Sequence, residues 1–173
     1  AAELVDGPVV IPQQAGAAGA PATARVPKSV FLEQVAHGLV YKTALDAQDI
    51  AWLDTQGYEA IQPAPFEGHR GFAMLGLRAK KGEQLPPVVA FRGTQTALLS
   101  AAADVRTDLQ DGVGEGQFDM NQGHIFEMLV TAGMGQTVEV TGHSLGGALA
   151  LVAAARLKRL TGVAALLHTY GQP

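Results

Sequence analysis

The sequence contains no cysteine, which excludes disulfide bonds and thiol chemistry and fits a bacterial protein of either the cytoplasm or the exterior. No apolar run approaches the roughly 20 residues that a membrane-spanning helix needs. The formal net charge of −4 leaves no basic stripe, so we expect no nucleic-acid partner. Residues 1–3, Ala-Ala-Glu, lack the basic and apolar regions of a signal peptide. The compartment stays open, and we favour a secreted or extracellular bacterial protein.

The chain contains enough apolar residues to form one sizeable hydrophobic core. The chain has 173 residues, of which 47% are apolar and 16% charged, as in globular domains. Residues 1–26 are rich in Pro, Ala, Gly and Gln, a composition that buries too little apolar surface to offset the entropy of ordering. We therefore expect a flexible tail or linker at 1–26 and one domain at 27–173. A linker at this end also leaves open a toxin or effector module fused behind a delivery domain.

Hydrophobic periodicity predicts alternating helices and strands. We expect helices at residues 29–41, 46–55, 124–132 and 145–160, and strands at residues 71–78, 87–92, 137–141 and 163–170. The first two strands should form a hairpin. Alternation in the second half predicts a parallel sheet with crossover helices, and hence an α/β fold.

The most informative segment is residues 142–147, Gly-His-Ser-Leu-Gly-Gly, which places Ser144 where a strand turns into a helix. This is the layout of a nucleophile elbow, a strained turn that exposes a serine hydroxyl to a base and to oxyanion donors. Gly142 and Gly146 make the turn feasible, because a Cβ at either position would crowd the neighbouring strand and helix. The segment predicts Ser144 as a catalytic nucleophile.

Acyl transfer also needs N–H donors aimed at the developing oxyanion. The Leu145 N–H should be one donor, since it is the first on the elbow helix and lies at the positive end of the helix dipole. Thr94 follows the predicted strand at 87–92 and is placed to offer both a backbone N–H and a hydroxyl. We expect Leu145 and Thr94 to form the oxyanion hole.

Three segments resemble the class 3 lipases, acyl hydrolases of the fungal-lipase type, in the right order along the chain. They are residues 88–94 (Val-Val-Ala-Phe-Arg-Gly-Thr), 141–150 (Thr-Gly-His-Ser-Leu-Gly-Gly-Ala-Leu-Ala) and 169–173 (Thr-Tyr-Gly-Gln-Pro). The resemblance implies an α/β-hydrolase fold with a mostly parallel sheet and helices on both faces, incomplete at its C-terminus. It implies a serine esterase, lipase or phospholipase that acts on lipid esters, contacts a lipid interface and uses neither cofactor nor metal.

The same resemblance assigns roles near Thr94. It points to Thr94 as an oxyanion residue, and it implies that the apolar stretch 95–105 is a lid over the serine, with an ordinary core helix as the alternative. Asp108 matches an acidic position of the family, which implies that its carboxylate orients the Thr94 hydroxyl.

A complete catalytic triad is not evident in the sequence. In α/β-hydrolases an acid and then a histidine follow the serine, yet residues 145–173 contain no Asp or Glu. The one later histidine, His168, falls inside a predicted strand, where the sheet would hold it. We interpret the other histidines as structural, and Arg92 as a buried partner of an aspartate; these histidines are His37, His69, His124 and His143.

Two interpretations follow. In the first, the chain is the N-terminal portion of a serine hydrolase whose Asp and His lie beyond Pro173 or on another chain. In the second, it is a catalytically inactive hydrolase-like module that binds a lipid or a protein partner, as part of a toxin or effector. Sequence beyond Pro173 would separate them.

Overall fold

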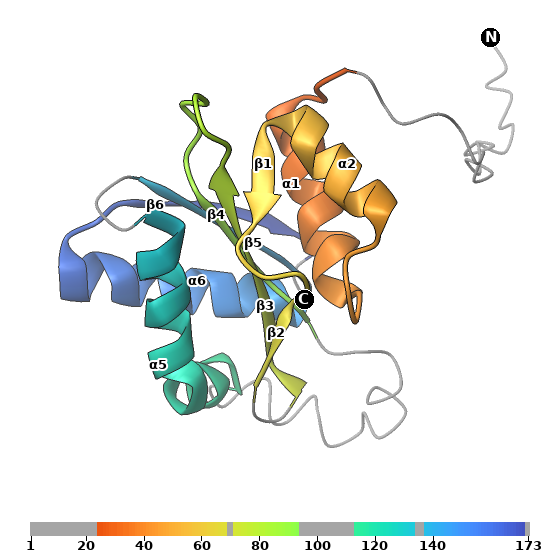
Figure 1. Ribbon diagram of the computed structural model, residues 1–173. Coiled ribbons are helices and arrows are strands. Elements are labelled where there is room, and N and C mark those ends of the chain that lie inside the picture. Colours follow the sequence, from red (N-terminus) through yellow and green to blue (C-terminus); the bar gives the residue numbers. More distant parts are fainter. Residues whose placement is uncertain (1–23, 69–70, 94–112, 134–136, 172–173) are drawn as a thin grey trace, which may run out of the picture.

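The computed structural model describes residues 24–68, 71–93, 113–133 and 137–171 (Figure 1). The helices are α1 (Lys28–His37), the 3₁₀ helix η1 (Leu39–Tyr41), α2 (Ala47–Gln56), α5 (Val113–Gly133) and α6 (Leu145–Thr161). The strands are β1 (Tyr58–Ala60), β2 (Phe66–Glu67), β3 (Ala73–Ala79), β4 (Val88–Phe91), β5 (Val138–His143) and β6 (Ala165–Tyr170).

The strands form one mixed sheet in the order β1-β3-β4-β5-β6, with β2 also paired to β3. Strands β3 and β4 pair antiparallel, as the predicted hairpin requires. The core strands β4, β5 and β6 run parallel, and α6 is the crossover between β5 and β6. The predicted parallel arrangement is confirmed for these strands, whereas β1, β2 and β3 add an antiparallel side.

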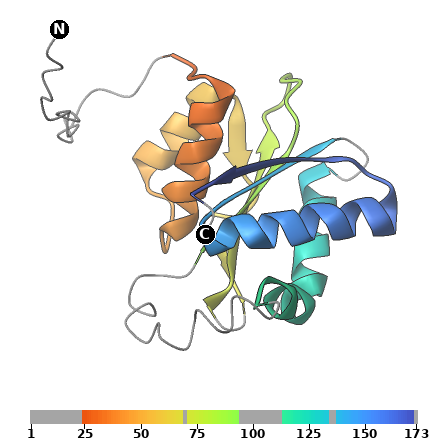
Figure 2. The ribbon, with the colours of Figure 1, turned by 180° about the vertical axis from the view of Figure 1, so that it is seen from behind.

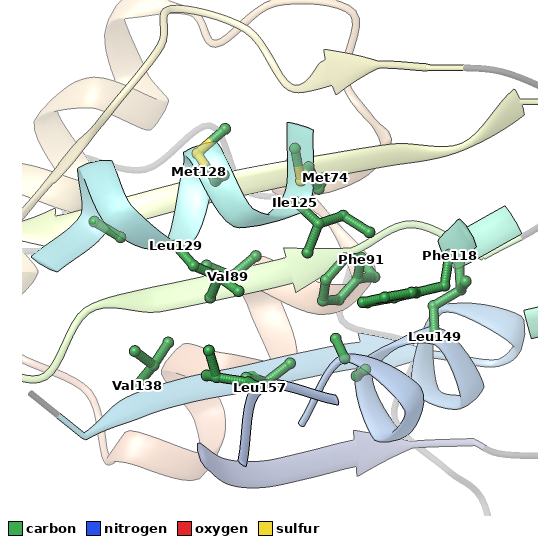
Figure 3. Packing of buried hydrophobic residues seen from close by; sticks show 14 of the residues in the cluster. Met74, Val89, Phe91, Phe118, Ile125, Met128, Leu129, Val138, Leu149 and Leu157 are labelled. Carbon is green, nitrogen blue, oxygen red and sulfur yellow. The ribbon is translucent and has the colours of Figure 1, made fainter. Parts of the chain in front are cut away.

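Helices cover both faces of the sheet. Figures 1 and 2 show α1 and α2 gathered on one side and α5 and α6 on the other. Alternate residues of β4 divide between two cores: Val89 and Phe91 pack with α5 and α6, while Val88 and Ala90 pack with α1 and α2. Figure 3 shows the first core, where side chains from α5, α6 and three strands meet. This sandwich fixes β4 and β5 at the centre of the molecule.

Helix α1 ends at His37, earlier than the predicted end at residue 41. The next residue, Gly38, adopts φ −114° and ψ −70° and donates its N–H to the Gln34 carbonyl oxygen at 2.9 Å. The chain then tightens into η1, whose Leu39 and Val40 side chains are buried. The apolar pattern continues through both elements, which is why periodicity alone predicted one helix.

Helix α2 matches its prediction closely. Asp46 caps its first turn in a reciprocal capping box with Asp49, and Gly57 ends it with φ +85°. Helix α5, in contrast, begins at Val113 rather than at residue 124. Glycines at 114, 116 and 123 lower the helix propensity of this stretch, so sequence alone placed the start too late.

Helix α1 is tied to β5 by an ion pair between a half-exposed lysine and a buried glutamate. Glu139 is fully buried in β5, and the Lys28 ammonium donates a hydrogen bond to its Oε1. A buried carboxylate is expensive unless a cation compensates it, so Lys28 makes this position tolerable. The pair fixes α1 over the strand that leads to Ser144.

Strand β6 lies at the end of the described sheet and pairs with β5 alone. Leu166 is 47% exposed and Leu167 is 37% exposed. Because successive residues of a strand face opposite sides of the sheet, apolar side chains are exposed on both faces of β6. Such an apolar edge is suited to pairing with a further strand. None of the described helices is long and apolar enough to cross a membrane.

Candidate active site

Ser144 lies on a strained turn between β5 and α6. It has φ 55° and ψ −127°, and it is the one non-glycine residue with a positive φ in the described ranges. Backbones in such sparsely populated regions persist only where the surroundings hold them. Here the Ser144 N–H donates to the Tyr170 carbonyl oxygen at 3.0 Å, and the Ser144 carbonyl accepts from the Gly147 N–H at 2.8 Å. Both β6 and the first turn of α6 therefore brace the serine.

The glycines on either side of Ser144 allow two backbones to touch. A Cβ at Gly142 would lie 2.1 Å from the Gly146 carbonyl oxygen, and a Cβ at Gly146 would lie 2.2 Å from that of Phe91. Both atoms belong to the main chain and cannot swing aside. The expectation that a Cβ would crowd the neighbouring strand and helix is confirmed at both positions.

Leu145 begins α6 directly after the serine, so its N–H belongs to the first turn of the helix. Its side chain is buried. Ser144 stands at the N-cap of α6, but its side chain makes no capping hydrogen bond to the described backbone. Because capping would engage the hydroxyl with the helix N–H groups, this arrangement leaves it available for chemistry.

The end of β4 packs directly on this turn. A Cβ at Gly93 would lie 2.7 Å from the His143 carbonyl oxygen and 3.2 Å from the Gly146 nitrogen. Thr94, the predicted second oxyanion residue, comes next in the chain. Thr94, the stretch 95–105 and Asp108 lie outside the described residues, so their roles stay predictions.

Arg92 is buried, with 7% exposure, and contacts Glu67. Its Nη1 donates to the Glu67 Oε1 at 2.9 Å, and its Nη2 donates to the Gly71 carbonyl oxygen at 3.1 Å. Glu67 is thus a carboxylate partner of Arg92 among the described residues, and the predicted aspartate partner stays a prediction, because residues 94–112 lie outside them. Strand β2 carries Glu67 to this place, and its two residues are too few for a recognisable strand pattern.

His143 packs inside the elbow between two neighbours. Its ring meets that of His37 edge to face at 4.5 Å between centroids, and a Cβ at Gly171 would lie 2.8 Å from its Nε2. Burial lowers the pKa of His143, the electrostatic interaction with His37 lowers it further, and Glu33 opposes the shift. A neutral imidazole packed in this way fits the structural role expected for His143.

The lowered pKa of His143 predicts a pH-dependent stability. Folding favours the neutral ring, so this contribution is complete above the ordinary pKa of 6.5 and is lost as pH falls through the folded-state value. We expect the Tm of the wild type to fall more steeply than that of His143→Gln between about pH 7 and pH 5. Thermal melts across this range test it, and parallel curves for the two proteins would contradict it.

The other histidines lie apart from any described triad. His168 is within β6, opposite Thr141 of β5, as expected for a residue held in the sheet. His124 is exposed on α5, with its ring 4.5 Å from that of Phe66, and His69 lies outside the described residues. Within the described ranges, Ser144 has no hydrogen bond to a histidine or a carboxylate, and no cluster of acidic and histidine side chains could hold a metal.

A family model for the Tle-like phospholipase domain, described as phospholipase-like, matches residues 23–165. The chain belongs to this family. A search of the curated proteins found no match.

Solved structures agree with the Tle-like phospholipase assignment at the level of fold. The chain is 25% identical to a lipase from Rhizopus microsporus var. chinensis, covering 84% of this chain and 55% of that one, with a TM-score of 0.53. The nonglycosylated LIP2 lipase of Yarrowia lipolytica is 20% identical over 87% of this chain and 61% of that one, with a TM-score of 0.55. These matches confirm the resemblance to fungal lipases and the α/β-hydrolase fold. The chain spans between half and two thirds of the length of these lipases.

Proposed function

We propose that this protein is a serine-dependent hydrolase of lipid esters, of the lipase or phospholipase type, which forms an acyl-enzyme at Ser144. The observation that carries the proposal is the strained positive φ of Ser144 between two glycines that admit no side chain. Backbone strain of this kind gathers at functional sites. The phospholipase-like family match supports a lipid ester as the substrate.

In the proposed reaction, Ser144 is the nucleophile, and Leu145, Thr94 and Asp108 serve the oxyanion hole. The Ser144 hydroxyl oxygen attacks the ester carbonyl carbon while a base takes its proton, and the carbonyl electrons move to the oxygen. The Leu145 N–H and the N–H and hydroxyl of Thr94 stabilise that oxyanion, with Asp108 orienting the Thr94 hydroxyl. The alcohol leaves with the proton, and water then releases the fatty acid and regenerates the serine.

The base and its orienting acid come from outside these 173 residues in this proposal, either in cis or on a separate chain. No described histidine or carboxylate is bonded to Ser144, and residues 145–173 contain no acid. The matched lipases are considerably longer than this chain, which supports a contribution from further polypeptide. Contact with a lipid surface and a location outside the cytoplasm accompany this substrate class and remain predictions.

The function is tested with the native full-length protein and vesicles of phosphatidylcholine and phosphatidylethanolamine. We expect the vesicles to yield free fatty acid and lysophospholipid in equal amounts, measured by mass spectrometry. A triglyceride emulsion and a short soluble ester are assayed in parallel as the other candidate substrates. Vesicle binding without release of any fatty acid would favour the alternative, an inactive module that binds lipid.

The oxyanion role predicts the behaviour of Thr94→Ala. This variant keeps the backbone N–H and loses the hydroxyl, so kcat for a short ester should fall by about 10²–10³ with little change in KM. Steady-state kinetics measure both constants. A loss confined to KM would assign Thr94 to substrate binding instead.

A further inference from the structure

The Gly93 N–H is a buried donor that follows the end of β4 and bonds to a side chain outside the sheet. The preceding residue, Arg92, still donates its N–H to the Ala73 carbonyl oxygen of β3 at 2.9 Å. The Gly93 N–H turns instead to the Tyr41 hydroxyl oxygen, at 3.0 Å. Since Gly93 is buried, this hydroxyl satisfies a main-chain group that would otherwise be desolvated without a partner.

Tyr41 is held firmly enough to fix the position of that donor. It ends η1, whose other two residues, Leu39 and Val40, are buried in the core beneath α1 and α2. On its other side, the Lys42 ammonium contacts both carboxylate oxygens of Asp49 at 2.6 Å. The tyrosine therefore projects from a turn that is anchored on both flanks.

Gly93 in turn sets the distance between β4 and the elbow. Its Cα has backbone atoms of both His143 and Gly146 so close that no Cβ fits between them. We infer that Tyr41 is a positioning residue for the oxyanion hole, an inference that rests on the proposed hydrolase function. The Tyr41 hydroxyl holds Gly93 against the backbone of His143 and Gly146, the residues that flank Ser144 and Leu145.

A positioning role predicts a specific kinetic effect. Oxyanion donors act on charge that develops in the transition state, so a shift of their backbone weakens the transition state far more than the bound ester. Misplacement of a catalytic group by about 1 Å is enough to lower the rate by 10²-fold. Loss of the hydroxyl should accordingly lower kcat about 10- to 100-fold and leave KM within about twofold.

The test is Tyr41→Phe in the native full-length protein, which removes one oxygen and keeps the ring. Tyr58→Phe is the matched control, because the Tyr58 hydroxyl also makes one main-chain hydrogen bond, to the Pro86 carbonyl oxygen at 3.0 Å. We expect the kcat loss in Tyr41→Phe alone, on a short soluble ester. The rate of inactivation by a fluorophosphonate, whose phosphoryl oxygen occupies the oxyanion hole, should fall in parallel.

The outcomes separate this inference from the proposed function. If the wild type hydrolyses the ester and Tyr41→Phe keeps its kcat and inactivation rate, the inference is wrong while the function stands. If the wild type shows no hydrolysis, the function fails first. If the thermal melt shows that Tyr41→Phe does not fold, Lys42→Met is the second variant. It removes the contact of the Lys42 ammonium with Asp49 and so loosens the turn that carries Tyr41. A kcat loss without a KM change is again expected, and an unchanged kcat would overturn the inference.

Discussion

Ser144→Ala is expected to lower kcat for ester hydrolysis by about 10⁶-fold in the native full-length protein, the size of loss seen when the catalytic serine of a serine protease is removed. The variant loses the hydroxyl that forms the acyl-enzyme in the proposed mechanism, while the proposed oxyanion donors and the binding surface remain. Residual hydrolysis of about 10³–10⁴ over the rate in water is therefore expected rather than none. KM should change little, because the hydroxyl contributes to bond formation more than to binding.

Ser29→Ala provides the matched control. Ser29 is an exposed residue of α1, and its described hydrogen bond uses the backbone carbonyl, which accepts from the Tyr170 hydroxyl at 2.8 Å. This variant should keep the wild-type kcat. A Ser144→Ala protein that retains its rate within about tenfold would remove the serine from the mechanism.

Gly146→Ala is expected to destabilise the fold by at least about 3 kcal/mol, the upper part of the range for overpacking. Its Cβ would lie 2.2 Å from the Phe91 carbonyl oxygen and 2.9 Å from the Gly93 nitrogen, both on the main chain of the central strand. Either β4 or the first turn of α6 must move. Since Ser144 is between them, any folded fraction should also lose its alignment with Gly93. Chemical denaturation with a circular-dichroism readout measures the change.

Gly123→Ala is the corresponding control within a helix. Gly123 is exposed on α5, and a Cβ there meets nothing within 4 Å. Alanine is a better helix former than glycine, so this variant should gain about 0.5–1 kcal/mol. Equal stability of Gly146→Ala and the wild type would contradict the close packing of α6 on β4.

The elbow was predictable from sequence because its determinants are local. A β-branched strand, a serine between glycines and an apolar helix follow one another without a gap, and β5, Ser144 and α6 appear in that order. The αL residue Gly57 and the capping residue Asp46 also act within a few positions of the helix they bound. Signals of this kind need no knowledge of the tertiary structure.

The parts that sequence did not predict depend on distant contacts. Tyr41 and Gly93 are 52 residues apart, and nothing near either residue indicates the hydrogen bond between them. The contact of Arg92 with Glu67 was missed because the short strand β2 is recognisable only through its pairing with β3. Likewise, the edge-to-face contact of His37 and His143 arises from the packing of α1 across the end of β5. Thr94 and Asp108 stay predictions.

The most direct test is to locate the covalent adduct of a fluorophosphonate on the native full-length protein by peptide mass spectrometry. The proposed mechanism predicts a single adduct, on the peptide that contains Ser144, with labelling abolished in Ser144→Ala. Labelling that persists in Ser144→Ala, or a wild-type protein that acquires no adduct at Ser144, would contradict the assignment of this serine as the nucleophile.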